Sequence, residues 1–129
     1  MAYPDSYRYT KEHEWIDVQG TTAKVGITDY AQNSLGDIVF VELPKVGSTI
    51  EKDKVFGSVE SVKSVSDLFA PASGKVAAVN EELTSAPEKI NTDAHSAWIL
   101  TLEISDPSEI AGLLTAADYE KFIAEEGAH

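Results

Sequence analysis

One lysine, Lys63, lies at the centre of the segment GSVESVKSVSDLF, which spans residues 57–69. Valine and serine alternate on both sides of it, a pattern typical of two short β-strands. If Val62 and Lys63 form the middle of a turn, the strands pair as a narrow hairpin in which Phe56 faces Phe69. The sequence therefore predicts a protruding hairpin with the Lys63 amine at its tip, exposed to water.

A lysine at such a tip is better suited to acylation by another enzyme than to catalysis. Acylation removes the charge of the amine and requires an active site to close on it. A catalytic lysine needs its pKa lowered by burial or by a neighbouring cation. Lys63 has the acidic neighbours Glu60 and Asp67 instead, and small serines beside it leave room for a modifying enzyme. Spacing alone nevertheless favours an ordinary surface lysine, so the assignment needs further support.

The rest of the chain predicts a small β-protein that would hold this hairpin. Short apolar runs recur about every ten residues with Gly and Pro between them, as in a β-sandwich or barrel. The expected strands are residues 16–18, 23–27, 37–43, 49–51, the two arms of 55–69, 75–79 and 98–104. Residues 1–12 are expected to be irregular.

Helices are expected at two places. Residues 28–35 predict a short helix that Gly36 ends. Residues 106–126 predict a pair of C-terminal helices, with caps at Asp106 and at 115–118. Apolar residues of the last helix have helical spacing and are assigned to packing: Tyr119, Phe122 and Ile123. We expect one domain over residues 1–129.

Composition excludes several kinds of site and partner. The chain has no cysteine, so disulfides, thiolate metal sites and cysteine nucleophiles are excluded. Its net charge of −12 would be repelled by phosphate backbones and anionic lipids, so neither nucleic acid nor membrane is an expected partner. The acidic surface suits solubility and docking onto basic proteins. His13, His95 and His129 lack metal-ligand spacing, and no metal site is expected.

Several motifs together resemble the H protein of the glycine cleavage system. The segment Glu60–Ser64, followed by APASGKV at residues 70–76, is similar to the lipoylation site of that family. The likeness covers nearly the whole chain and includes HEW at 13–15, VGITDYAQ at 25–32, LGDIVFVELP at 35–44, VN at 79–80 and both C-terminal helices. Taken together these motifs are specific, although each alone is weak.

The resemblance implies a carrier without a catalytic site, holding lipoate on Lys63 through an amide. A lipoate ligase or an octanoyl or lipoyl transferase would recognise Glu60, Ser61, Val62 and Ser64. In the family, glycine decarboxylase loads an aminomethyl group onto the arm, an aminomethyltransferase passes its carbon to tetrahydrofolate, and dihydrolipoyl dehydrogenase reoxidises the dithiol. The implied fold is a flattened barrel-sandwich hybrid with flanking helices. We expect a monomer.

The resemblance also implies a role for two acidic residues. In the family the loaded arm folds back into a surface cleft, where acidic groups hold the cationic aminomethyl nitrogen. The matching positions here are Glu14 and Asp67. A carboxylate would stabilise the ammonium group, and an apolar wall would slow attack by water. Alternatively, both carboxylates are merely solvated.

One segment departs from the family pattern, and three other functions stay open. Asp93–Ala97, before Trp98, lacks the usual Pro, Tyr and Gly, which puts in doubt the shape of this loop and its partner contacts. The chain could instead be a lipoyl or biotinyl carrier of another complex, although valine and serine rather than methionine flank Lys63. It could be an H-like protein that relays lipoyl groups to other enzymes, or an interaction module with an unmodified lysine.

The expected location follows from the N-terminus. An initiating Met without a signal peptide or presequence favours a bacterial cytoplasm, and a processed chain of the mitochondrial matrix is the alternative.

Overall fold

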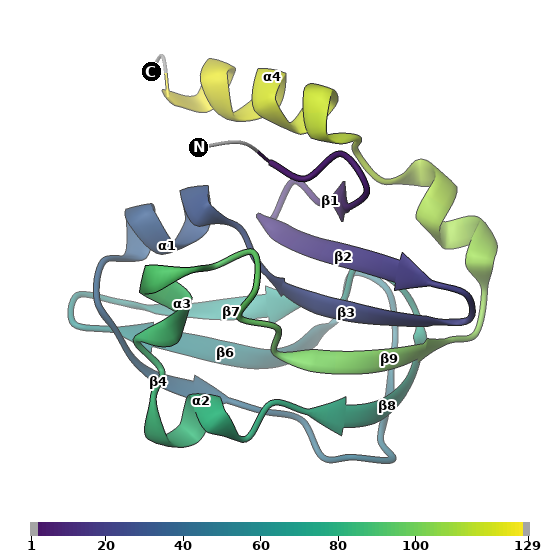
Figure 1. The fold of residues 1–129 in the computed structure, drawn as a ribbon, viewed down its shortest axis with the longest axis horizontal. Helices are drawn as coiled ribbons and strands as arrows, with labels where there is room; N and C mark the ends of the chain where they lie inside the picture. The colour runs from purple at the N-terminus through teal and green to yellow at the C-terminus, as the bar shows by residue number, and fades with distance from the viewer. Residues whose placement is uncertain (1–2, 128–129) are drawn as a thin grey trace.

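Residues 3–127 are described by the computed structural model, and their strands form two antiparallel sheets (Figure 1). The larger sheet contains, in spatial order, β1 (Arg8–Tyr9), β2 (Glu14–Gln19), β3 (Thr22–Ile27), β9 (Leu100–Ile104), β8 (Gly74–Val79) and β5 (Thr49–Ile50). The smaller sheet contains β4 (Ile38–Glu42), β6 (Val55–Ser61) and β7 (Val65–Phe69). The prediction of a mainly β fold is confirmed.

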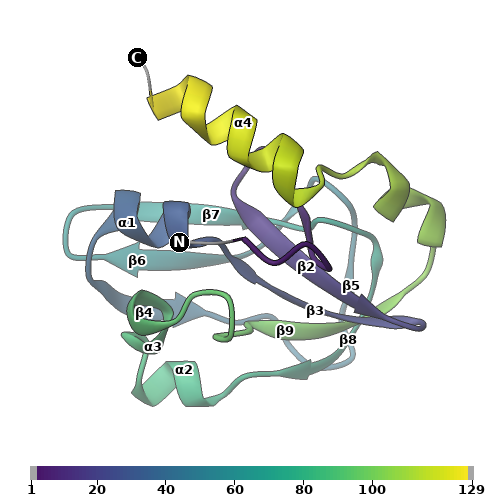
Figure 2. The same ribbon diagram turned by 45° about the horizontal axis from the view of Figure 1, so that its top comes forward.

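The helices are short except for the last one. They are α1 (Asp29–Leu35), α2 (Glu82–Ser85), α3 (Lys89–Thr92), the 3₁₀-helix η1 (Pro107–Gly112) and α4 (Ala116–Gly127). Figures 1 and 2 show α1, α2 and α3 at the same end of the sheets as the turn of the β6–β7 hairpin, whereas α4 lies over β1 and β2. The single-turn helices α2 and α3 were not predicted, because one turn gives no periodic pattern.

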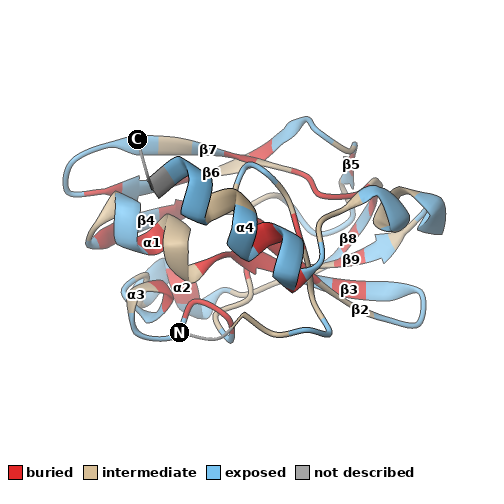
Figure 3. Ribbon diagram, turned by 90° about the horizontal axis from the view of Figure 1, so that it is seen from above, coloured by how far each residue is buried: buried red, intermediate tan, exposed pale blue. Residues whose placement is uncertain are grey.

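Buried side chains from both sheets form one apolar core. Figure 3 colours the ribbon red where residues are buried. In β3, Ala23 and Val25 are buried while Thr22 and Lys24 are exposed, as alternation along a strand requires. Fully burying a valine or leucine side chain contributes about 1.5–3 kcal/mol. The core therefore provides the rigid base from which the β6–β7 hairpin projects.

A second, aromatic cluster lies beneath α4. The rings of Tyr9 and Tyr119 stack with centroids 4.9 Å apart, and Trp15 is buried in the same cluster. Tyr9 also pairs with Trp15 across β1 and β2. The prediction that residues 1–12 are irregular is therefore wrong for Arg8–Tyr9. A two-residue strand is too short to show an alternating pattern.

The C-terminal segment follows the prediction in part. Asp106 caps its helix by accepting a hydrogen bond from the Ser108 amide, but this helix, η1, is a 3₁₀-helix. The Glu109 carboxylate accepts from the backbone amide and the hydroxyl of Ser73, at 2.7 and 3.0 Å, instead of closing a capping box. At α4 the predicted cap is confirmed, because Thr115 Oγ1 accepts from the Asp118 amide at 3.2 Å.

The hairpin has the predicted register along most of its length. Pairs from Glu60/Val65 to Gly57/Leu68 are as expected. A β-bulge between Val55 and Gly57 then places Val55 opposite Phe69, so the predicted Phe56/Phe69 pair is wrong. The bulge turns Phe56 into the core, where only 9% of it is exposed.

Candidate functional site

Lys63 lies in the turn between β6 and β7, the loop that projects furthest to the left in Figure 1. Lys63 is exposed, and among residues 3–127 its amine forms no salt bridge. The Ser61 amide donates to the Ser64 carbonyl at 2.8 Å and closes the turn. The predicted hairpin tip is therefore present, with its amine open to solvent.

The side chain of Ser61 organises this turn. Its Oγ accepts hydrogen bonds from the amides of Lys63 and Ser64, at 3.3 and 3.1 Å, and donates to the Ser64 carbonyl at 3.2 Å. Serine hydroxyls form such local turns with the backbone. Only 6% of Ser61 is exposed, whereas the other predicted recognition residues are exposed: Glu60, Val62 and Ser64. Ser61 therefore has a structural task within the turn.

The tip rests on the connection between α1 and β4. The Val62 amide donates to the Asp37 carbonyl at 3.0 Å. Gly36 ends α1 with φ of 83°, a left-handed conformation that favours glycine, and a Cβ built there would lie 3.7 Å from Lys63 Cε. Asn91 of α3 fixes this connection, since its side chain donates to the Gly36 carbonyl and accepts from the Ile38 amide, both at 2.9 Å. Asn91 was not predicted, because its segment lacks a recognisable pattern.

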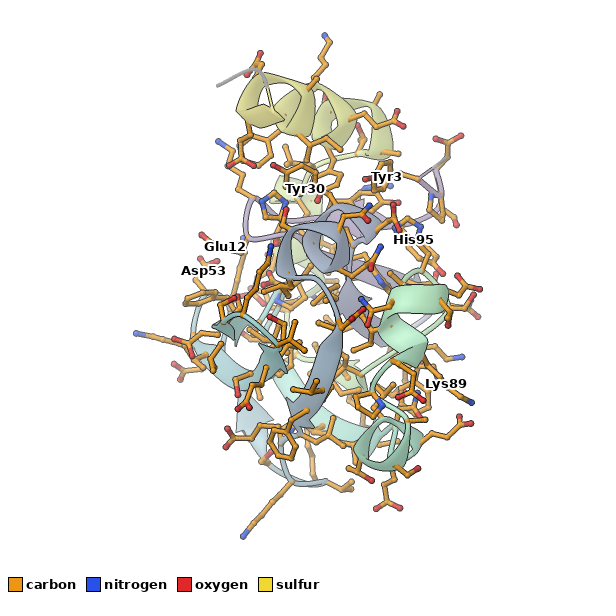
Figure 4. The ribbon with its side chains drawn as sticks, turned by 90° about the vertical axis from the view of Figure 1, so that its left-hand side faces the viewer. Tyr3, Glu12, Tyr30, Asp53, Lys89 and His95 are labelled. Carbon is orange, nitrogen blue, oxygen red and sulfur yellow. The ribbon has the colours of Figure 1, made fainter. Side chains whose placement is uncertain are left out.

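An open groove with a volume of about 440 Å³ runs along α1. It is lined by Glu12, His13, Tyr30, Ala31, Ser34, Leu35, Ser66 and Glu126. Leu35 directly precedes Gly36, which lies against the Lys63 side chain, and His13 Nε2 at the groove is 3.2 Å from Glu126 Oε2. Figure 4 views this side of the molecule and labels Glu12 and Tyr30. The groove thus leads from the Lys63 side to a group of acidic residues.

Glu14 lies at the start of β2 and is almost fully buried, with 1% exposed. Its carboxyl accepts from the Thr10 hydroxyl at 2.6 Å and from the Phe69 amide at 3.3 Å. Burial raises the pKa of Glu14 to about 8, against the two hydrogen bonds, which lower it. At neutral pH this carboxyl is therefore mostly protonated, and it ties the base of the β6–β7 hairpin to β2.

Asp67 has different surroundings from Glu14. It is exposed on β7 opposite Ser58, whose hydroxyl donates to the Glu42 carboxylate at 3.2 Å. The preceding residue, Ser66, lines the groove. Because successive residues of a strand point to opposite faces, Asp67 lies on the outer face of the smaller sheet. The roles predicted for Glu14 and Asp67 thus involve one buried and one exposed carboxyl group.

Two histidines have structural partners. His13 Nδ1 lies 2.8 Å from the Tyr119 hydroxyl, and burial lowers the pKa of His13 while Glu126 acts in the opposite direction. His95 Nε2 accepts from the Asp29 amide at 3.2 Å at the start of α1, and burial lowers the pKa of His95. In residues 3–127 no group of three or more His, Asp or Glu side chains is placed to hold a metal ion. His129 lies outside the described residues.

The segment Asp93–Ala97, which departs from the family pattern, packs closely on the protein. Ala94 is buried, and its carbonyl accepts from Trp15 Nε1 at 3.0 Å. Gly26 makes room for this indole, because a Cβ there would lie 2.6 Å from Trp15 ring atoms. Beside the segment is a hollow of about 300 Å³ that includes Trp98. The segment thus supports Trp15 and, through His95, α1.

Comparison with known proteins decides the family. A family model described as glycine cleavage H-protein matches residues 7–126. The chain belongs to this family. It is 70% identical to the glycine cleavage system H protein of Acidobacterium capsulatum and 69% identical to that of Koribacter versatilis, over 129 residues and all of each chain. The crystal structure of an H protein from Mycobacterium marinum matches with a TM-score of 0.85 and 39% identity, covering 97% of this chain and 99% of that one.

Family membership confirms the predicted function at the level of the system. The chain is an H-protein component of the glycine cleavage system, and H proteins are non-catalytic lipoyl carriers. None of the helices within residues 3–127 is long and apolar enough to cross a membrane.

Proposed function

We propose that Lys63 is the residue that carries the lipoyl group. The observation that supports this most directly is the exposed Lys63 side chain on a turn fixed by Ser61 and by the Asp37 carbonyl. An acylating enzyme would condense the carboxyl group of lipoate with Lys63 Nζ at the expense of ATP. The amide bond would form with net loss of water, and the amine would lose its charge. When bound, lipoate supplies a dithiolane for redox and group-transfer chemistry. The protein itself presents this group to the enzymes that act on it.

The groove along α1 is the proposed resting place of the arm between reactions. Ala31 and Leu35 offer apolar contacts near Lys63, and such walls would exclude water from a labile aminomethyl group. Glu14 and Asp67 stay our predicted partners for the cationic nitrogen, although neither lines the groove and Asp67 lies on the outer face of the smaller sheet. The groove itself contains two further carboxylates, Glu12 and Glu126, which we add as candidates. The predominantly neutral state of Glu14 at pH 7 means that an arriving cation would have to promote its ionisation.

The proposed partners are glycine decarboxylase, an aminomethyltransferase and dihydrolipoyl dehydrogenase, together with the enzyme that acylates Lys63. The exposed tip supports this proposal, since each partner must reach the lysine or its arm. The bacterial relatives support a location in the cytoplasm.

The test is to lipoylate the purified protein and incubate it with glycine decarboxylase and radiolabelled glycine. We expect glycine-dependent labelling of the arm and release of carbon dioxide. A protein that is not loaded, yet donates lipoyl groups to a carrier of another complex, would be a lipoyl relay instead. Omission of glycine and the Lys63→Arg variant are the matched controls.

A further inference from the structure

The smaller sheet and its β6–β7 turn expose apolar side chains near Lys63. The exposed fractions are 47% for Val39, 51% for Phe40, 69% for Val62 and 64% for Val65. Exposed apolar residues scattered singly are normal, but a contiguous group with a polar rim marks an interaction site. This group adjoins the residue that we propose is modified.

Strand register places two of these residues, Phe40 and Val65, on either side of Glu60. Phe40 lies opposite Glu60, and Glu60 lies opposite Val65, so the three form a row across the sheet next to the tip. The next row is Glu42, Ser58 and Asp67. Apart from Ser58, every polar residue of the two rows is acidic.

A β-bulge explains why β4 exposes two consecutive apolar residues. The bulge lies between Ile38 and Phe40, where an extra residue disturbs the pairing with β6. Ile38 and Val41 remain buried, whereas Val39 and Phe40 are both exposed. Bulges re-aim side chains in this way. We call Val39, Phe40, Val62 and Val65 the Phe40 patch. Glu60 lies within it, between Phe40 and Val65, and Asp37, Glu42 and Asp67 form its acidic rim.

We propose that the Phe40 patch docks the enzyme that acylates Lys63, through an apolar depression bordered by Lys or Arg side chains. This inference rests on the proposed role of Lys63. The acylating enzyme must bring its active site to Lys63 Nζ itself, so it has to cover the surface beside the tip. Enzymes that act at the end of the arm can remain further away. The acidic rim matches a basic border, because opposite charges steer association and fix the orientation of partners.

Initial rates of acylation test this proposal. A lipoate ligase, lipoate and ATP are combined with increasing concentrations of the unmodified carrier. We expect Phe40→Ser to lower kcat/KM about tenfold, mainly through KM, as loss of an interface anchor does. Phe40→Leu should restore most of the rate. Glu42→Lys should lower kcat/KM more at low salt than at high salt.

Two surface variants outside the patch serve as controls. Val46 is 60% exposed in the turn after β4, and Val46→Ser should acylate like the wild type. Glu103 is exposed on β9 of the other sheet, and Glu103→Lys should have a smaller effect than Glu42→Lys. Circular dichroism melting checks that each variant is folded. Equal rates for Phe40→Ser and Val46→Ser would overturn the proposal.

Competition separates docking from chemistry. Lys63→Arg protein should inhibit acylation of the wild type, and the double variant Lys63→Arg, Phe40→Ser should inhibit about tenfold less well. Equal inhibition by both would contradict the docking role.

Size-exclusion chromatography tests whether the patch binds a second copy of the chain instead. A wild-type dimer that Phe40→Ser dissociates, with acylation unchanged, would assign the patch to self-association. A wild type that is acylated elsewhere would instead reject the role of Lys63 itself.

Discussion

The two ends of the β6–β7 hairpin are held in different ways. At the tip, Lys63 is exposed, and the turn is fixed by hydrogen bonds to Ser61 and to the Asp37 carbonyl. At the base, the Phe69 amide donates to the carboxyl of buried Glu14. The tip is thus ordered without apolar cover, whereas the base depends on a buried titratable group.

This difference separates chemistry from stability along a single hairpin. Changes at the tip should alter what the protein carries and leave the core intact. Changes at the base should alter the free energy of unfolding and its dependence on pH, and leave the amine accessible. Substitutions at each end test the separation.

The largest effect is expected from Lys63→Arg. The guanidinium group cannot form the amide, so lipoyl acceptance and glycine-dependent loading should be lost completely. The side chain is exposed, and the free energy of unfolding should change by less than about 0.5 kcal/mol. Mass spectrometry after ligase treatment and urea denaturation measure the two quantities. Retained loading activity would contradict the assignment of Lys63.

The next largest effect is expected at Glu14. Its pKa is about 8 in the folded protein against an ordinary value of 4.5, so between these pH values the folded state binds more protons than the unfolded state. The protonated Glu14 carboxyl therefore contributes its full share to the free energy of unfolding below about pH 4.5. This contribution is lost as pH rises through about 8, and the free energy of unfolding falls by roughly 3–5 kcal/mol in total.

Glu14→Gln removes this titration. The wild type should lose stability as pH rises from 4.5 to 8, and the variant should not. The difference in free energy of unfolding between variant and wild type should therefore shift by a few kcal/mol in favour of the variant over this range. Urea denaturation at several pH values measures the difference, and acylation of Lys63 should be unchanged. Parallel stability curves for the two proteins would show that Glu14 does not titrate as the structure indicates.

Ser61→Ala should have a smaller effect. It removes the acceptor for the amides of Lys63 and Ser64, which should lower the free energy of unfolding by about 1 kcal/mol. A looser turn should also slow acylation several-fold. Ser64→Ala is the matched control, because no hydrogen bond of the Ser64 hydroxyl is found within residues 3–127. Equal behaviour of the two variants would remove Ser61 from its role in the turn.

The smallest effect overall is expected for Asp67→Asn. Asp67 is exposed and opposite Ser58, so the free energy of unfolding should change by less than about 0.5 kcal/mol. If Asp67 holds the cationic nitrogen, the loaded arm should lose its aminomethyl group faster in the variant. The decay of radiolabel from purified loaded protein measures this rate. An unchanged decay would leave the role to other carboxylates.

The sequence predicted the features that depend on local pattern. Alternation around Lys63 indicated the hairpin, and the spacing of Tyr119, Phe122 and Ile123 indicated the packed face of α4. The bulges that turn Phe56 inward and Phe40 outward were not predicted, because they depend on pairing with a partner strand.

The surroundings of Glu14 at the candidate site also depend on contacts that a local sequence pattern does not predict. The resemblance implied a cleft carboxylate at Glu14 and did not indicate its burial against Thr10 and the Phe69 amide. Phe69 is 55 residues away along the chain, so no local pattern reveals this contact. Resemblance along the whole chain identified the family, whereas tertiary packing determines the burial and protonation of the Glu14 carboxyl group.

The central claim is that Lys63 is the attachment point of the carrier. Peptide mass spectrometry of the protein after treatment with a lipoate ligase, lipoate and ATP tests it most directly. We expect the added mass of one lipoyl group on the peptide that contains Lys63. A lipoyl group on another lysine, with Lys63 unmodified, would contradict it.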